Sequence, residues 1–167
     1  MIDNLALLNA DALVAMYGDF PPLGNLRLRS LSMDWRGPTV TLRVDLPSFP
    51  AVVPQEWEGK EVDTVQCHLQ FLAVEDLSLT EWEPPVPYVA MQVQPLNENR
   101  RIRVGMTGVG VGLGFTSSAS IVVGHVSAFK ISADGADGSR HFFLKKLDRM
   151  RYESIPATEE KTFHGRI

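Results

Sequence analysis

Cys67 and His68 stand next to each other in the chain, and their side chains are of the types that form a nucleophile and its base. Neighbouring residues of an extended strand point to opposite faces, so these two cannot act together locally. Cys67 also falls on the apolar row of its strand and is expected to be a small core residue. We therefore expect Cys67 and His68 to have no catalytic role, with Cys67 packed in the core.

The four histidines are the other candidates for catalysis or metal binding, and they are far apart: His68, His125, His141 and His164. None has a second ligand at the i, i+3 or i, i+4 spacing of a metal-binding helix. The loop Asp134 to Gly138 lacks the alternating oxygen ligands and the closing glutamate of a calcium loop. We therefore assign no catalytic, cofactor-binding or metal-ligating residue, and we expect no cofactor and no enzymatic activity.

Glycines recur along one segment, at 105, 108, 110, 112 and 114. No G-x-G-x-x-G and no G-x-x-x-x-G-K phosphate loop fits their spacing. Since Val109, Val111, Leu113 and Phe115 alternate with them, the glycines predict a strand face that a bulky neighbour approaches closely. An alternative function uses the same feature: a small-ligand-binding or enzymatic domain with a cavity at the glycine-lined strand 105–115.

Two short segments each place a tryptophan between carboxylates: Glu56, Trp57 and Glu58, and then Glu81, Trp82 and Glu83. Tryptophan is enriched at interface hot spots, and flanking carboxylates steer a basic partner during approach. The alternative is that each tryptophan caps the core while its neighbours stay in water. These six residues are the predicted protein interface.

Composition restricts the class of partner and the compartment. The chain of 167 residues has a net charge of −4 and a pI near 5.5, so a dedicated nucleic-acid binder is not expected. A single cysteine excludes an internal disulfide, and no run reaches the roughly 20 apolar residues of a membrane span. The start of the chain also lacks the pattern of a signal peptide. We expect a soluble, cytoplasmic protein without membrane contact.

The fold is organised around the segment Val62 to Glu83, which predicts a long central strand, a turn and a second strand. In this strand an apolar row on one face, Val65, Cys67, Leu69, Phe71 and Ala73, alternates with Gln66, His68 and Gln70 on the other. Before it, a hairpin spans 26–46, with a bulge near Ser30 and a turn at 37–38. Its inward rows are Leu26 and Leu28, then Leu31, Met33 and Trp35, and finally Val40, Leu42, Val44 and Leu46. Its last strand turns Thr39, Thr41, Arg43 and Asp45 outward.

Four more strands are predicted after the central pair, over 87–93, 100–106, 109–115 and 120–132, the last interrupted near Gly124. Asn97 to Asn99 supplies one turn, and Gly105 with Gly108 brackets the next. A short N-terminal helix covers 10–17, capped by Asn9 or Asp11 and ended by Gly18. A C-terminal helix uses the apolar positions Phe143, Leu147 and Met150.

The predicted fold class is α+β, a large, mostly antiparallel sheet of about six to eight strands with a short N-terminal helix and a C-terminal helix. Residues 1–155 are expected to form a single domain. Residues 156–167 have little apolar content and are expected to form a flexible tail.

Three segments give the chain a recognisable order: Tyr17-Gly18-Asp19-Phe20-Pro21, then His68-Leu69-Gln70-Phe71, then Val74-Glu75-Asp76-Leu77-Ser78-Leu79. In this order the chain resembles the family numbered fifty among the immunity proteins of bacterial polymorphic toxin systems, over roughly Leu5 to Lys130. The resemblance implies an α+β fold with a large antiparallel sheet. It also implies a non-enzymatic protein that binds a cognate toxin made by the same bacterium, and it assigns no catalytic residue.

The hypothesis is therefore an immunity protein that neutralises a cognate toxin, with a basic nuclease as one candidate, through the acidic and aromatic segments named above. The small-ligand or enzymatic domain remains the alternative. A homo-oligomer joined through an exposed strand is a third. The sequence leaves the oligomeric state open.

Overall fold

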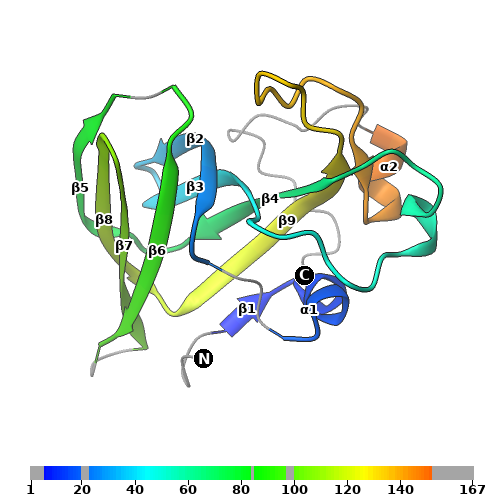
Figure 1. The fold of residues 1–167 in the computed structure, drawn as a ribbon. Coiled ribbons are helices and arrows are strands. Elements are labelled where there is room, and N and C mark those ends of the chain that lie inside the picture. Colours follow the sequence, from blue (N-terminus) through cyan, green and yellow to red (C-terminus); the bar gives the residue numbers. More distant parts are fainter. Residues whose placement is uncertain (1–5, 20–22, 84, 97–99, 152–167) are drawn as a thin grey trace.

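The computed structural model describes residues 6–19, 23–83, 85–96 and 100–151. These residues form a ten-stranded sheet with a short helix near each end of the chain (Figure 1). The strands are β1 (Ala6–Leu8), β2 (Leu26–Asp34), β3 (Thr39–Asp45), β4 (Thr64–Phe71), β5 (Glu75–Trp82), β6 (Tyr88–Pro95), β7 (Arg101–Gly108), β8 (Val111–Ser118), β9 (Ser120–Phe129) and β10 (Phe142–Phe143). The helices are α1 (Asp11–Tyr17), the 3₁₀ turn η1 (Gln55–Trp57) and α2 (Lys146–Arg151).

The sheet is mixed but mostly antiparallel, with the strand order β1-β9-β4-β3-β2-β6-β7-β8-β5 and β10 paired to β9. Among the strands of the described residues, only β1 and β9 run parallel. The predicted mostly antiparallel sheet is confirmed, and it has ten strands where about six to eight were expected. The two additional strands, β1 and β10, have three and two residues. Such short strands are defined by the partner they pair with, and no sequence period marks them.

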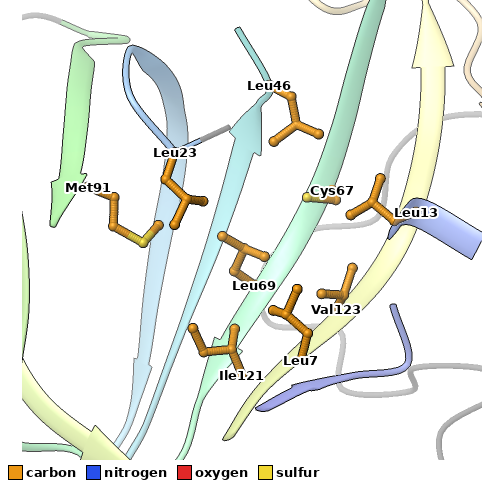
Figure 2. A pocket seen from close by; sticks show the side chains of 9 residues that line it. All are labelled: Leu7, Leu13, Leu23, Leu46, Cys67, Leu69, Met91, Ile121 and Val123. Atoms are coloured by element: carbon orange, nitrogen blue, oxygen red, sulfur yellow. The ribbon is translucent and has the colours of Figure 1, made fainter. Parts of the chain in front are cut away.

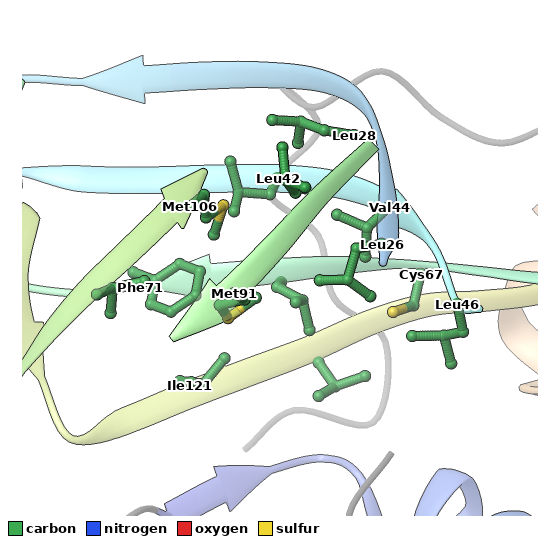
Figure 3. Close-up of a cluster of buried hydrophobic side chains, with 14 of the residues drawn as sticks. Leu26, Leu28, Leu42, Val44, Leu46, Cys67, Phe71, Met91, Met106 and Ile121 are labelled. Atoms are coloured by element: carbon green, nitrogen blue, oxygen red, sulfur yellow. The ribbon is translucent and has the colours of Figure 1, made fainter. Parts of the chain in front are cut away.

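The sheet bends sharply where β2 meets β6. Only Leu26 and Arg27 of β2 pair with β6, whereas β2 pairs with β3 along most of its length. The register of β2 shifts between Leu28 and Ser30, which confirms the bulge predicted there. Because of this bend, apolar side chains from both parts of the sheet meet: Met91 of β6 and Met106 of β7 lie among side chains of β2, β3 and β4 (Figure 3).

The core lies inside this bend. Leu26, Leu42, Phe71 and Met106 are fully buried in one apolar cluster, and the Phe71 ring meets Phe115 of β8 edge to face, 4.9 Å between centroids. Burying a side chain of this size stabilises the fold by about 1.5–3 kcal/mol. The inward rows predicted for β3 and β4 are therefore the observed core.

The opposite face of β3 and β4 is also buried, contrary to the prediction that Thr39, Thr41, Arg43 and Asp45 face solvent. Thr41 and Asp45 are 5% and 3% exposed, and Gln66 and His68 of β4 are fully buried. The loop after β9 packs over this face: Arg29 Nη1 donates to the Gly135 carbonyl at 2.8 Å, and Arg43 Nη1 lies 2.8 Å from an Asp137 oxygen. Residues 130–145, called the cover segment below, thus convert a polar strand face into a polar layer inside the protein.

Helix α1 ends as predicted but begins differently. Gly18 adopts a left-handed conformation with φ 77°, and its N–H donates to the Val14 carbonyl. The N-cap residue is Ala10, without a side-chain cap, so the prediction of Asn9 or Asp11 was wrong. Asn9 instead donates from its amide to the Val123 carbonyl at 2.9 Å, which joins the residue between β1 and α1 to β9.

Two other boundaries differ from the prediction. Gly105 lies within β7, and the turn between β7 and β8 is formed by Val109 and Gly110. Phe143 belongs to β10, and the C-terminal helix begins only at Lys146, because pairing with β9 takes precedence over the helical spacing. The turn predicted at Asn97 to Asn99 and the tail predicted for 156–167 lie outside the described residues. The domain boundary at residue 155 stays a prediction.

Candidate interaction surface

The two segments with a tryptophan between glutamates lie on opposite sides of the molecule. The first forms η1, beside α2, and the second ends β5 at the other extreme of the sheet (Figure 1). The fold therefore does not bring the six residues together into one surface. Each segment has to be considered by itself.

In the first segment the tryptophan is part of the core. Trp57 is 2% exposed and lies 6.3 Å from the ring of Phe49, while Glu56 and Glu58 are exposed. A Glu56 carboxylate oxygen lies 3.9 Å from Arg149 of α2. Only the two carboxylates of this segment are available to a partner in this conformation, and their place in an interface stays a prediction.

The second segment is more accessible. Strand β5 is exposed along its length except for Trp82, which is half-buried and packs against the core. Glu81 and Glu83 are both exposed. Strand β5 is the last in the sheet order and, within the described part of the chain, pairs only with β8. It therefore presents an acidic strand edge to a partner.

The structure brings together histidines that the sequence spacing keeps apart. The rings of His68 and His125 meet edge to face at 4.8 Å between centroids, and His125 Nδ1 donates to Asp148 at 3.1 Å. A bulge in β9 makes this possible: the register shifts opposite Gln66 and His68, and His125 has φ 50°. The strand was predicted to be interrupted near Gly124, whereas β9 runs without a break through this residue and carries a bulge there. Only the fold shows which side chains the bulge brings into contact.

A serine and a third histidine also meet beneath the cover segment. His141 Nε2 donates to the Asp137 carbonyl at 2.9 Å, so its Nδ1 accepts from the Ser127 hydroxyl at 2.8 Å. The pair has the composition of a nucleophile and base, but Ser127 is fully buried and His141 is 2% exposed and stacked on Phe129. A substrate carbonyl has no access to this hydroxyl, so the arrangement serves to hold the cover segment.

Cys67 is also unreactive as a nucleophile because it is buried. The thiol is fully buried, and burial together with the nearby charge of Asp45 raises its pKa to about 12. The thiolate is therefore a negligible fraction near neutral pH. Among the described residues, no group of three His, Cys, Asp or Glu side chains is placed to hold a metal ion.

The glycines of β7 and β8 face other parts of the protein. A methyl group at Gly112 would collide with the Thr80 hydroxyl of β5, and one at Gly114 would lie 2.9 Å from the Arg103 guanidinium of β7. Close approach between neighbouring strands thus accounts for both residues. The alternative of a ligand cavity at this strand gains no support from them.

An apolar cavity does lie in the core, between the N-terminal region and the sheet (Figure 2). Its volume is about 20 Å³, and its wall includes Leu7, Leu13, Cys67, Leu69 and Val123. A void of this size holds about one water molecule, and an apolar lining leaves it dry. It has no room for a small-molecule substrate.

Comparison with known proteins identifies the family. The family model described as Immunity protein 50 matches residues 9–135, which is more than half of the chain. No curated protein and no solved structure matches. In the part of the chain that the structure describes, neither helix is long and apolar enough to cross a membrane. The chain therefore belongs to the Immunity protein 50 family, and this membership implies that it neutralises a toxin.

Proposed function

We propose that the protein neutralises a toxin of its own bacterium by binding it without catalysis, and so covers the toxin's active site or an exosite. The observation that carries this proposal is the match to Immunity protein 50 over residues 9–135, since an immunity protein implies a cognate toxin as partner. The buried state of Ser127, His141 and Cys67 supports the non-catalytic part, because a substrate has no access to these reactive side chains.

The proposed binding surface includes the acidic edge of β5. Glu81 and Glu83 flank the half-buried Trp82 at the end of a strand that pairs on one side only. A strand edge offers unpaired backbone groups to an incoming segment, and the carboxylates favour a basic one. The net charge of −4 agrees with a basic partner. A nuclease is the toxin class that this charge favours, because a protein that binds nucleic acid needs a concentrated basic surface.

Charge reversal tests which segment faces the toxin. The variant E81K/E83K changes β5, and E56K/E58K changes η1 by the same net charge. If β5 forms the interface, the first variant should weaken binding to the toxin domain by about tenfold or more, since like charges at an interface rim slow association and can cost several kcal/mol. The second variant should bind as the wild type does. Biolayer interferometry at two salt concentrations provides both rates.

Replacing the tryptophans is a poorer test on its own. Trp57 is a core residue, so Trp57→Ala would create a cavity and unfold part of the population. Trp82→Ala is the more informative change, provided that the circular dichroism spectrum and the unfolding midpoint stay close to those of the wild type. Unchanged affinity of both E81K/E83K and a folded W82A would remove β5 from the proposed surface and leave toxin binding itself standing.

A further inference from the structure

A groove lies between the β2–β3 turn and the start of β5, and no part of the family assignment accounts for it. It has a volume of about 380 Å³, which is about the volume of a dozen water molecules. One wall is formed by Met33, Asp34 and Trp35 at the end of β2, and the other by residues 74–77. The Val74 N–H donates to the Pro38 carbonyl at 2.8 Å, so the two walls are joined at the backbone.

The apolar side chains of the groove are unusually exposed. Trp35 is 83% exposed and Met33 57%, and Leu77 on the facing wall is 38% exposed. A large aromatic in water next to two further apolar side chains is a typical anchor point of a protein interface. Because the end of β2 extends past β6, these residues are left outside the core, although their row was predicted to point inward.

The charged side chains of the groove are all acidic. Asp34, Glu75 and Asp76 line it, and among the described residues no lysine, arginine or histidine does. Two arginines lie next to it. Arg101 approaches Glu75 at 3.5 Å, and the guanidinium of Arg36 lies 5.7 Å from the centre of the Trp35 ring. Trp35 thus already takes a cation near its face, and the carboxylates leave the groove negative.

We propose that this groove receives a segment of the toxin that carries a lysine or arginine beside an apolar side chain, an inference that rests on the toxin-binding function proposed above. The basic group lies between the ring of Trp35 and the carboxylates of Glu75 and Asp76. The apolar neighbour packs on Met33 and Leu77. The groove continues directly into β5, since Glu75 and Asp76 are the first residues of that strand, so one toxin segment contacts both surfaces.

Arg36 offers a variant that should strengthen binding of the basic segment rather than weaken it. It is exposed, and its cation competes with an incoming one for the Trp35 ring. Removing its charge in Arg36→Gln should strengthen binding of a basic segment by a few fold. Removing carboxylates should weaken the same binding.

The direct test uses two peptide probes and nuclear magnetic resonance of the full chain. One probe is an acetylated, amidated pentapeptide of alternating lysine and leucine, and the other replaces each lysine by glutamate. The lysine peptide should cause saturable shifts in the Trp35 indole N–H and in residues 74–77, and the glutamate peptide should not. The variants W35A and E75Q/D76N should bind the lysine peptide at least about tenfold more weakly.

The variants are chosen to leave the fold intact. Trp35 is almost fully exposed, and Asp76 has φ 52°, a conformation that asparagine tolerates. Matched controls are V109A, which trims a side chain that is 93% exposed at the β7–β8 turn, and D11N/E61Q, which removes two exposed carboxylates elsewhere. Both controls should bind as the wild type does. No saturable shift at millimolar lysine peptide, or equal binding by W35A and E75Q/D76N, would overturn the proposal.

The same variants, tested against the toxin domain that co-purifies with the wild type, separate this inference from the proposed function. Loss of binding in W35A and E75Q/D76N supports both. Binding equal to the wild type refutes the groove and leaves toxin neutralisation in place. If the wild type captures no toxin, the proposed function fails, and the peptide titration still decides whether the groove binds basic segments. A wild-type dimer that W35A dissociates, seen by light scattering, would assign the groove to a second copy and overturn the toxin segment.

Discussion

Asp45 lies at the centre of the buried polar layer beneath the cover segment. One of its oxygens accepts from Arg29 Nη2 at 2.6 Å and from Arg29 Nε at 3.0 Å, and the other accepts from the Gln66 amide at 2.7 Å. The side chains of Asp45 and Arg29 are 4% and 3% exposed. Each of these two buried charges is stabilised by the other, because water cannot solvate either one if its partner is removed.

Neutralising Asp45 should therefore be costly. Asp45→Asn keeps the size of the side chain but leaves the buried Arg29 charge with only the more distant Asp137 carboxylate, 4.0 Å from Nε. The free energy of unfolding should therefore fall by about 3 kcal/mol. Urea unfolding followed by circular dichroism measures the loss.

Asp63 supplies the matched control for this change. It pairs with Lys130 at 3.1 Å on the surface, where the side chains are 37% and 62% exposed. Asp63→Asn should cost less than about 1 kcal/mol. Equal losses in the two variants would contradict the account of the polar layer.

His141 makes the stability of the cover segment depend on pH. Burial lowers its pKa, and this effect exceeds the opposing influence of the Asp137 carbonyl and carboxylate. The unfolded chain then takes up the proton more readily than the folded chain. The free energy of unfolding should consequently fall as the pH drops through the unfolded value of about 6.5.

His141→Gln removes this titration and can still form hydrogen bonds. The variant should be less stable than the wild type by about 1–2 kcal/mol at pH 7.5, and its stability should change less between pH 7.5 and pH 5. The two proteins share all their other ionisable groups, so the difference between the two curves is the quantity to measure. Parallel curves would show that His141 does not carry the effect.

Asp137 contributes in a lower pH window. Burial alone would raise its pKa, but the hydrogen bond from Gln66 and the charges of Arg43 and Arg29 lower it overall. Its contribution to stability is therefore present above the unfolded pKa of about 3.9 and is lost as the pH falls further. The cover segment should thus weaken in two steps, with the histidine titrating first.

At the scale of elements, the strands show which parts of the sequence pattern were informative. The strands β3 and β4 were predicted because their apolar residues alternate over seven or more positions. In β2 the alternation shifts by one residue after Leu28, and this shift predicted the bulge. The same alternation could not show that Asp45 and Gln66 are buried. Their burial depends on the cover segment, and no periodic pattern in the sequence shows that this segment packs over β3 and β4.

The glycines in β7 give a prediction with an internal control. A methyl group at Gly108 would collide with the Tyr88 carbonyl of the neighbouring strand, whereas one at Gly105 would meet Gln92 Oε1 at an ordinary 3.9 Å. Gly108→Ala should therefore cost about 1–3 kcal/mol of unfolding free energy, because the backbone of β6 has to move. Gly105→Ala should be neutral or slightly stabilising. The thermal unfolding midpoints of the two variants rank them, and the reverse order would be evidence against close approach at Gly108.

At the scale of the whole molecule, the bend in the sheet decides what a partner meets. It places η1 and the end of β5 on opposite sides, and it brings the β2–β3 turn next to the start of β5. The sequence offered Trp57 and Trp82 as interface residues with equal weight, because both are flanked by glutamates. It assigned Trp35 to the core. Only the folded chain shows that Trp57 is buried and Trp35 is exposed. Trp35 is exposed because the end of β2 extends beyond the part that pairs with β6.

The family and the general fold were within reach of the sequence, whereas the binding surface was not. The order of the segments around Tyr17, His68 and Val74 is enough to indicate the family that the comparison shows. The groove combines residues 33–40 with residues 74–77, and these segments are joined in space rather than by any spacing in the chain. Its assignment to a toxin segment remains our proposal.

The most direct test of toxin neutralisation is capture of the tagged protein from its own host under conditions that retain complexes, followed by an activity assay of whatever is bound. We predict one stoichiometric partner that carries a secretion region and a variable C-terminal domain, whose toxic activity is lost at an equimolar ratio and returns when the complex is dissociated. Recovery of the protein alone, from cells shown to express such toxins, would contradict the account.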